Sequence, residues 1–244
     1  LPLRYHYKIP LRDTVSSGVV TRNQKSPIKN EKKGVVAQEL EKFRSGTKFF
    51  SASLLSTYIL CPLKFYFMHI EGVKDEEIVS ESVESRTFGT ILHNSMAILY
   101  RRFEGKDVCK KDLLAILNNQ SLIDDIIYKE FKKEKGVEDV KGYNYIICNL
   151  IQRYIIKIIK YDLGFNSFRY IQSEKDIRSS LKLRDGTEVK LKAYIDRIDR
   201  VNGKLRIIDY KTGRKPDTMK SLNQLFEQNS SKNLSVFFQL YLYG

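Results

Sequence analysis

The chain has 244 residues, of which 42% are hydrophobic and 30% charged, so it is long enough to bury a sizeable core. Its 43 Lys and Arg against 29 Asp and Glu give a formal net charge of +14, which favours a polyanionic partner. The sequence shows three widely spaced cysteines, no long apolar run and no signal peptide. This pattern excludes a disulfide framework, a zinc ribbon and a membrane-spanning role, and it is typical of a cytoplasmic protein.

Residues 1–47 are interpreted as a linker or N-terminal arm, because they are rich in Lys, Asn, Ser and Thr and hold only one short helical piece, VVAQELEKF. The remaining residues, 48–244, are taken as one domain. Helices are predicted at about 53–70, 89–104, 110–135, 142–163 and from 235 onward. Strands are predicted at 168–177, 180–200 and 204–212, with an Asp185-Gly186 turn inside the second. A helical half thus precedes a mostly antiparallel or mixed sheet, and the fold class is α/β.

The helix predicted at 89–104 carries His93 beside its apolar stripe. Leu92, Met96, Leu99 and Phe103 recur at helical spacing, and His93 lies next to this stripe. A lone histidine there is more often a structural hydrogen-bonding residue. The Gly89 four positions earlier and the acidic hairpin downstream favour a site role instead.

The helix predicted at 142–163 has a basic face formed by Arg153, Lys157 and Lys160. The opposite face is apolar and consists of Leu150, Ile151, Tyr154, Ile155 and Ile158. A basic stripe is usually only a solvated face. Next to a site that acts on nucleic acid it becomes a candidate phosphate contact, non-specific in sequence and weakened by salt.

The stretch AYIDRIDRVNGKLRIIDYKTG predicts a hairpin, because Asn202-Gly203 favours a type I′ turn. The residue numbers of each pair of opposed residues then sum to 405, which places Asp196 opposite Asp209. Side chains that face each other in this way repel when both are negative, unless a cation lies between them. Lys211 shares the face of Asp209. Two acids and an ammonium group are therefore expected to converge.

The alternative is a hairpin whose polar face is simply solvated. Ile198 is expected opposite Ile207 beside the acidic pair, so this face is predicted to be at least half buried, where unpaired carboxylates are costly. A divalent metal ion would relieve that cost. Asp199 opposite Arg206 on the other face is interpreted as an ordinary exposed ion pair.

Five sequence elements together resemble the RecB-like branch of the PD-(D/E)XK nuclease superfamily, the C-terminal nuclease domain of RecB/AddB-type helicase-nucleases. They are SASLLSTYILCPLKFYF (51–67), FGTILHN (88–94), IDRID, DYKTG thirteen residues after the first Asp of IDRID, and QLYLY. The resemblance covers about residues 50–244 and implies a restriction-endonuclease-like core.

On this resemblance, His93, Asp196 and Asp209 are metal ligands, and Asp196, Asp209 and Lys211 form the catalytic set. Gln239 and Tyr243 match a Gln-x-x-x-Tyr element that helps hold DNA in relatives. Glu174 matches an acidic residue of the preceding strand, with its metal contact left open, and Ala193 stands where relatives usually have Gly. Oxygen ligands with an imidazole suit Mg²⁺ or Mn²⁺.

The resemblance also implies helicase-like domains in the same or a partner polypeptide, in DNA repair and recombination. Some relatives bind an iron–sulfur cluster through a cysteine at the position of Cys61 and three cysteines after the last helix, so a cluster here requires cysteines beyond residue 244. The sequence lacks an initiator Met and stops within the Gln-x-x-x-Tyr helix. We therefore expect a piece of a longer protein, truncated within the family's domain.

Two functions stay open at this point. One is a divalent-metal-dependent, exonuclease-like deoxyribonuclease. The other is a catalytically inactive DNA-binding or scaffold module that keeps the nuclease fold. Motifs for other chemistry, such as a P-loop, Gly-x-Ser-x-Gly or His-Glu-x-x-His, are absent from the sequence. The intact set of acids, His93 and Lys211 favours the enzyme.

Overall fold

The computed structural model describes residues 33–73, 85–213, 218–226 and 235–243. Its helices are α1 (Val35–Arg44), α2 (Ala52–Leu60), α3 (Pro62–Phe65), η1 (Tyr66–Ile70), α4 (Ser85–Arg101), α5 (Lys110–Asn118), α6 (Gln120–Lys135), α7 (Tyr143–Asp162), η2 (Leu222–Phe226) and α8 (Ser235–Tyr243). Its strands are β1 (Asp107–Cys109), β2 (Ser167–Lys182), β3 (Glu188–Val201) and β4 (Lys204–Ile208).

The four strands form one sheet in the order β1-β2-β3-β4, and every neighbouring pair is antiparallel. Phe50 adds an isolated parallel bridge to Leu191 of β3. The predicted α/β class, with a helical half before the sheet, is confirmed. Strand β1 was not predicted, because three residues are too few to show an alternating pattern.

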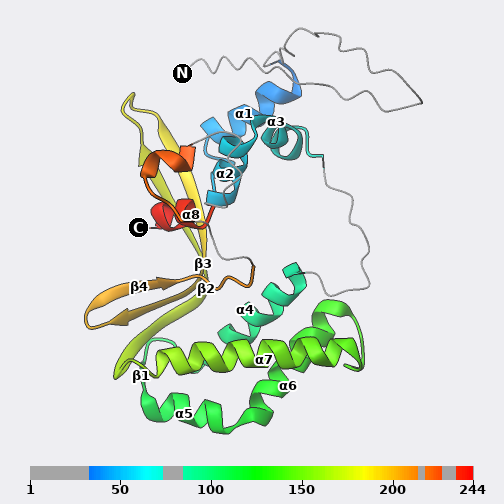
Figure 1. Cartoon of the computed structure of the whole chain (residues 1–244). Helices are drawn as coiled ribbons and strands as arrows, with labels where there is room; N and C mark the ends of the chain where they lie inside the picture. Colours follow the sequence, from blue (N-terminus) through cyan, green and yellow to red (C-terminus); the bar gives the residue numbers. More distant parts are fainter. Residues whose placement is uncertain (1–32, 74–84, 214–217, 227–234, 244) are drawn as a thin grey trace, which may run out of the picture.

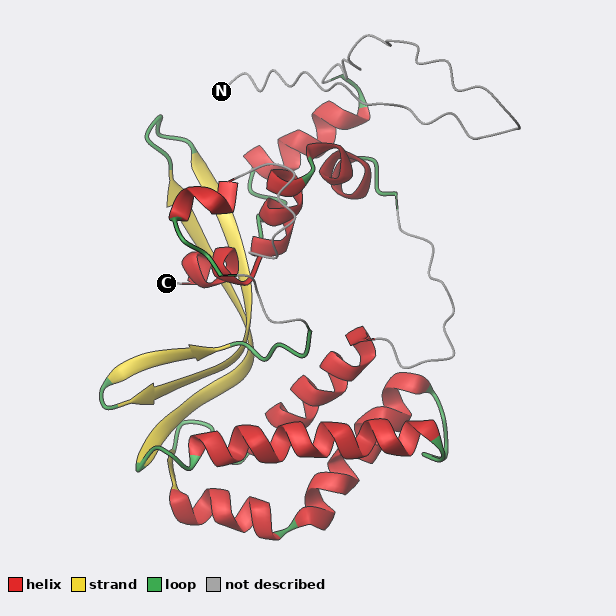
Figure 2. Ribbon diagram, in the orientation of Figure 1, coloured by secondary structure: helices red, strands yellow, loops and turns green. Residues whose placement is uncertain are grey.

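Two groups of helices flank the long β2–β3 hairpin (Figure 1). Helices α4 to α7 gather at the end of the sheet that carries β1, whereas α1, α2 and α8 lie beside the other end of the hairpin (Figure 2). The larger hydrophobic core belongs to the first group and includes Ile91, Ile127, Ile155 and Phe168. A smaller cluster of Phe43, Leu54 and Ile70 belongs to the second group.

The predicted helix at 53–70 is interrupted at Cys61. Proline disfavours helical geometry in the residue before it, and Cys61 is accordingly extended, with φ −155° and ψ 96°. Its sulfur then accepts a hydrogen bond from the Lys64 N–H at 3.4 Å and caps α3. The predicted helix at 110–135 is likewise two helices, because Asn119 leaves the helical region and caps α6 through a bond from the Leu122 N–H.

The strand boundaries also differ from the prediction. β2 runs without interruption to Lys182, and the turn that contains Asp185 and Gly186 joins it to β3. The exposed polar residues at the far end of β2 hide the strand pattern there. Strand β4 ends at Ile208 instead of residue 212, because the Tyr210 N–H donates to the Asp196 carboxylate at 2.6 Å and not to a strand carbonyl.

The apolar face predicted for α7 was partly wrong. Leu150 and Tyr154 are 41% and 38% exposed, whereas Ile159 is fully buried together with Ile151 and Ile155. The predicted basic residues do lie on the exposed side of this helix. Residues 1–32 lie outside the described part, so the division of the chain at residue 47 stays a prediction, although Phe43 of α1 already packs in the smaller cluster.

All three cysteines are described and are free thiols. No described helix combines the length and the apolar character that crossing a bilayer requires.

Candidate active site

The β3–β4 hairpin has the predicted turn and register. Asn202 and Gly203 both have positive φ, 49° and 77°, as a type I′ turn demands. The ladder runs from Val201 opposite Lys204 to Arg197 opposite Ile208, each pair summing to 405. Asp196 and Asp209 occupy the next position, directly beyond the end of β4.

Three side chains from three elements converge at this position. His93 of α4, Glu174 of β2 and Asp196 of β3 each offer a ligand atom, and these atoms lie within 4.8 Å of one another. The His93 Nδ1 is 3.3 Å from Asp196 Oδ1. Asp196 is only 5% exposed, which confirms the sheltered face that the hairpin pattern predicted.

Glu174 is the residue whose role the sequence left open. Ser173 pairs with Arg197 and Lys175 with Ile195, so Glu174 falls opposite Asp196. Its backbone has φ 52°, an uncommon conformation for a non-glycine residue and one that concentrates at functional sites. Counting opposed residues from the turn located Asp209 opposite Asp196. The same count along β2 and β3 locates Glu174 opposite Asp196, but it requires the correct turn between these two strands.

Tyr210 connects His93 to Asp196 through its backbone. Its N–H donates to Asp196 Oδ2 at 2.6 Å, and its carbonyl oxygen lies 2.8 Å from His93 Nε2. A carbonyl only accepts, so Nε2 carries a hydrogen. A neutral ring therefore points the Nδ1 lone pair at the Asp196 carboxylate, and two acceptors at 3.3 Å need a proton or a cation between them.

The electrostatics of the cluster fit a cation. Burial raises the pKa of Glu174, and the neighbouring Asp196 charge raises it further. Burial works against a charged His93, but the Asp196 carboxylate raises the pKa of His93 overall. The Oε1 atom of Glu174 is buried and has no hydrogen-bond partner. The Glu174 oxygen without a hydrogen bond, the His93 imidazole and the Asp196 carboxylate make a donor set that suits Mn²⁺ or Mg²⁺.

Asp209 lies beside this cluster and outside the group of atoms within 4.8 Å. Its Oδ2 pairs with the Lys211 ammonium at 2.7 Å, and its Oδ1 accepts from the Gln239 amide of α8 at 2.7 Å. Burial raises the pKa of Asp209, and the Asp196 charge adds to that rise, so the two acids influence each other as predicted. Whether Asp209 is a metal ligand stays a prediction.

Gln239 and Tyr243, predicted as a pair on one helix, meet on α8. The Gln239 amide donates to the Tyr243 hydroxyl at 2.6 Å, and that hydroxyl donates to the Tyr194 carbonyl at 3.0 Å. The helix is thereby attached to both β3 and Asp209.

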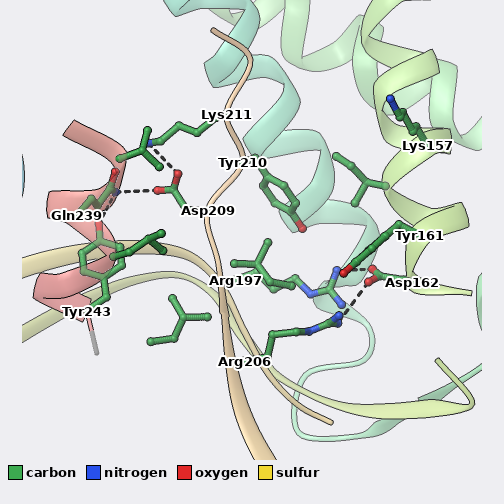
Figure 3. A pocket seen from close by; sticks show the side chains of 15 residues that line it. Lys157, Tyr161, Asp162, Arg197, Arg206, Asp209, Tyr210, Lys211, Gln239 and Tyr243 are labelled. Atoms are coloured by element: carbon green, nitrogen blue, oxygen red, sulfur yellow. Dashed lines mark hydrogen bonds and ion pairs between the residues drawn. The ribbon is translucent and has the colours of Figure 1, made fainter. Parts of the chain in front are cut away.

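A pocket of about 610 Å³ opens next to Asp209 and Lys211. Figure 3 shows Gln239 and Tyr243 with these residues on one side of it, and Lys157 and Tyr161 of α7 on the other. Of the three predicted basic contacts, Lys157 lines this pocket, whereas Arg153 and Lys160 do not.

The predicted exposed ion pair between Asp199 and Arg206 is instead part of a buried network. Asp199 is fully buried and binds Arg206 through Oδ1 at 2.7 Å and Arg197 through Oδ2 at 2.8 Å. Asp162 of α7 joins the same two guanidinium groups. The expectation failed because the last residue of α7, Asp162, reaches this face of the hairpin, which strand alternation alone does not reveal.

A family model described as the PD-(D/E)XK nuclease superfamily matches residues 49–244. The chain belongs to this superfamily, as its motifs predicted.

The curated relatives that the chain matches are much longer than the chain. An ATP-dependent helicase/deoxyribonuclease subunit of Carboxydothermus hydrogenoformans is 30% identical over 186 residues, which cover 68% of this chain and 16% of the relative. Proteins of the same name from Clostridium perfringens and Clostridium acetobutylicum are 27% and 25% identical, over 82% and 71% of this chain. The chain spans less than a fifth of the length of these two relatives, 18% and 16%.

Proposed function

We propose that this chain is the nuclease part of a DNA helicase-nuclease and hydrolyses DNA phosphodiester bonds with Mg²⁺ or Mn²⁺. The observation that carries the proposal is the convergence of His93, Glu174 and Asp196 ligand atoms within 4.8 Å, directly beside the Asp209–Lys211 pair. The names of the helicase/deoxyribonuclease relatives support DNA as the substrate and a helicase as the partner. The three free thiols support a reducing, cytoplasmic setting.

In this proposal His93, Glu174 and Asp196 hold the ion, with Asp209 as a further candidate ligand. A bound hard divalent ion polarises the scissile phosphate and lowers the pKa of water. Lys211 is 46% exposed on its side chain, so its ammonium can reach a substrate and stabilise the negative charge that develops on the phosphate. Gln239 fixes the Asp209 carboxylate that holds this ammonium.

DNA is proposed to approach along the pocket between α7 and α8. Lys157 supplies a cation on one wall, and Gln239 and Tyr243 supply polar groups on the other. Such contacts read the phosphate backbone without reading base sequence. End-directed cutting, as in an exonuclease, remains part of the proposal.

Two substitutions test the catalytic assignment in the full polypeptide. We expect Lys211→Ala and Asp209→Ala each to lower the rate of cleavage of end-labelled DNA by about 10²–10³-fold in Mg²⁺ or Mn²⁺. DNA affinity, measured by fluorescence anisotropy in Ca²⁺, is expected to change little, because the phosphate contacts are spread over other residues.

The matched control is Lys182→Ala, which removes an exposed lysine at the far end of β2. It should cut at the parent rate. A parent protein that binds DNA yet cuts none with either metal would support the inactive DNA-binding module, as would Lys211→Ala activity equal to that of the control.

A further inference from the structure

Arg197 lies directly behind Asp196. Successive strand residues point to opposite faces of a sheet, so Arg197 extends to the side of β3 away from the acidic cluster. It is 1% exposed, and its guanidinium carbon stacks over the rings of Tyr100 and Phe168 at 4.4 and 4.8 Å. A charge buried this deeply is held by strong partners or is strongly destabilising.

Two acids compensate this charge and fix its position. Nη1 donates a hydrogen bond to Asp162 at 2.5 Å, and Nη2 forms an ion pair with Asp199 at 2.8 Å. The Tyr100 hydroxyl of α4 donates to the same Asp162 carboxylate at 2.8 Å. Arg197 is therefore held by groups from α4, α7 and β3 at once, and its planar fork has little freedom to move.

Tyr210 lies between this anchored guanidinium and the acidic cluster. Its hydroxyl is buried beside Arg197, without a well-aligned hydrogen-bond partner. Figure 3 shows the hydroxyl end of its ring pointing toward Arg197. On the other side, the ring meets the His93 imidazole edge to face at 5.7 Å.

The backbone of Tyr210 needs this support, because it lies two residues beyond the end of β4. The ladder that would otherwise fix it ends at the pair of Arg197 and Ile208. Yet the Tyr210 N–H and carbonyl are the groups that bind Asp196 and His93, at 2.6 and 2.8 Å. Any shift of the Tyr210 ring therefore moves the hydrogen bonds that orient two of the cluster residues.

We propose that Arg197 is a positioning residue for the metal site, which acts through Tyr210 to hold His93 and Asp196 in register. The inference rests on the proposed function, since it concerns the same ion. Outer partners that orient metal ligands typically change metal affinity by about 10–100-fold when they are replaced.

The test is Mn²⁺ binding in the absence of DNA, followed by electron paramagnetic resonance. Arg197→Lys keeps the positive charge and loses the planar fork beside Tyr210. We expect it to weaken Mn²⁺ binding by about tenfold and to alter the line shape of the bound ion.

Arg206→Lys is the matched control, because Arg206 shares both Asp162 and Asp199 with Arg197 but stacks on Phe165 at 4.4 Å. A purely structural role for the network predicts equal effects of the two substitutions on Mn²⁺ binding. We expect Arg206→Lys to lower the melting temperature and to leave Mn²⁺ affinity within about twofold of the parent, well below the change expected at Arg197.

Tyr210→Phe provides a second variant if Arg197→Lys does not fold, because it removes only the hydroxyl. It should weaken Mn²⁺ binding in the same direction. The inference is overturned if Tyr210→Phe binds Mn²⁺ as tightly as the parent, or if Arg197→Lys and Arg206→Lys lose equal Mn²⁺ affinity. Either result leaves the nuclease proposal standing. A parent that shows no Mn²⁺ binding sensitive to His93→Ala overturns the nuclease proposal, and the inference with it.

Discussion

Asp162 is the residue through which helix α7 is fastened to the sheet. Its carboxylate accepts from the Tyr100 hydroxyl at 2.8 Å and from Arg197 at 2.5 Å, and it pairs with Arg206 at 3.3 Å. It is 1% exposed. Burial of a carboxylate is tolerable here because two guanidinium groups balance it, and the same bonds keep α4, with His93, against β3, with Asp196.

Asp162→Asn should therefore be strongly destabilising. The amide keeps the shape of the side chain, but it leaves the buried Arg197 and the partly buried Arg206 with one carboxylate between them. We expect the free energy of unfolding to fall by about 3–5 kcal/mol, measured by urea denaturation.

Asp176→Asn is the matched control for this substitution. Asp176 pairs with Arg178 at 3.1 Å, and the two side chains are 50% and 64% exposed, so water already screens the pair. Loss of this ion pair should lower the free energy of unfolding by less than about 1 kcal/mol. Equal losses for the two variants would show that the Asp162 network contributes no more than a surface ion pair.

At the scale of elements, helix α4 places His93 against the end of β4. One turn before His93, Gly89 faces the loop after Lys211, and a Cβ at Gly89 would lie 3.5 Å from Thr212 Oγ1, an ordinary contact. The glycine is thus not required by lack of space. Gly89→Ala is expected to stabilise the protein by about 0.5–1 kcal/mol through helix propensity, as followed by thermal unfolding.

Gly203→Ala is the contrasting change in the hairpin turn. With φ +77° and no heavy atom within 4 Å of an added Cβ, only backbone conformation opposes alanine there. Because alanine disfavours the left-handed conformation, Gly203→Ala should lower the free energy of unfolding by about 1–2 kcal/mol. If Gly89→Ala destabilises as much as Gly203→Ala, the helix at Gly89 is under a constraint that its contacts do not account for.

The hairpin was predictable because its signal is local. Asn202-Gly203 fixes the turn, the turn fixes the register, and the register locates Asp196 relative to Asp209. The break before Pro62 has an equally local signal in the proline itself. The end of β4 was not predictable, because it depends on a side-chain bond from Asp196 to the Tyr210 backbone.

The cluster itself was only partly predictable. His93 could be found from its helix and the family motif, whereas Glu174 depends on the pairing of β2 with β3, which in turn depends on the correct turn between them. The contact of Asp162 with Arg206 joins residues 44 positions apart and leaves no periodic pattern in the sequence.

At the scale of the whole molecule, two helical groups meet at the site. Helix α4 supplies His93 from one group, α8 supplies Gln239 from the other, and the long hairpin of β2 and β3 supplies the acids between them (Figure 1). The net charge of +14 should attract DNA to the protein in general and does not favour one face. What distinguishes α7 is that Lys157 lines the pocket beside Lys211, and that Arg153 and Lys160 lie on the same exposed side of the helix.

This placement predicts that α7 cations contribute more to DNA affinity than equally exposed cations elsewhere. Neutralising Arg153, Lys157 and Lys160 to Gln should reduce the slope of log K against log salt by about 2–3, since each phosphate contact contributes about 0.7–0.9. Affinity is measured by fluorescence anisotropy in Ca²⁺ over a salt series.

The control neutralises three exposed lysines around β1 and the start of α5, which Figure 1 shows at the end of the molecule away from α8: Lys106, Lys110 and Lys111. The overall charge falls equally in both variants, so a general effect of net charge changes both slopes alike. Equal slopes would remove α7 from the path of the DNA, whereas a change confined to the α7 variant would assign the exposed side of α7 to phosphate binding.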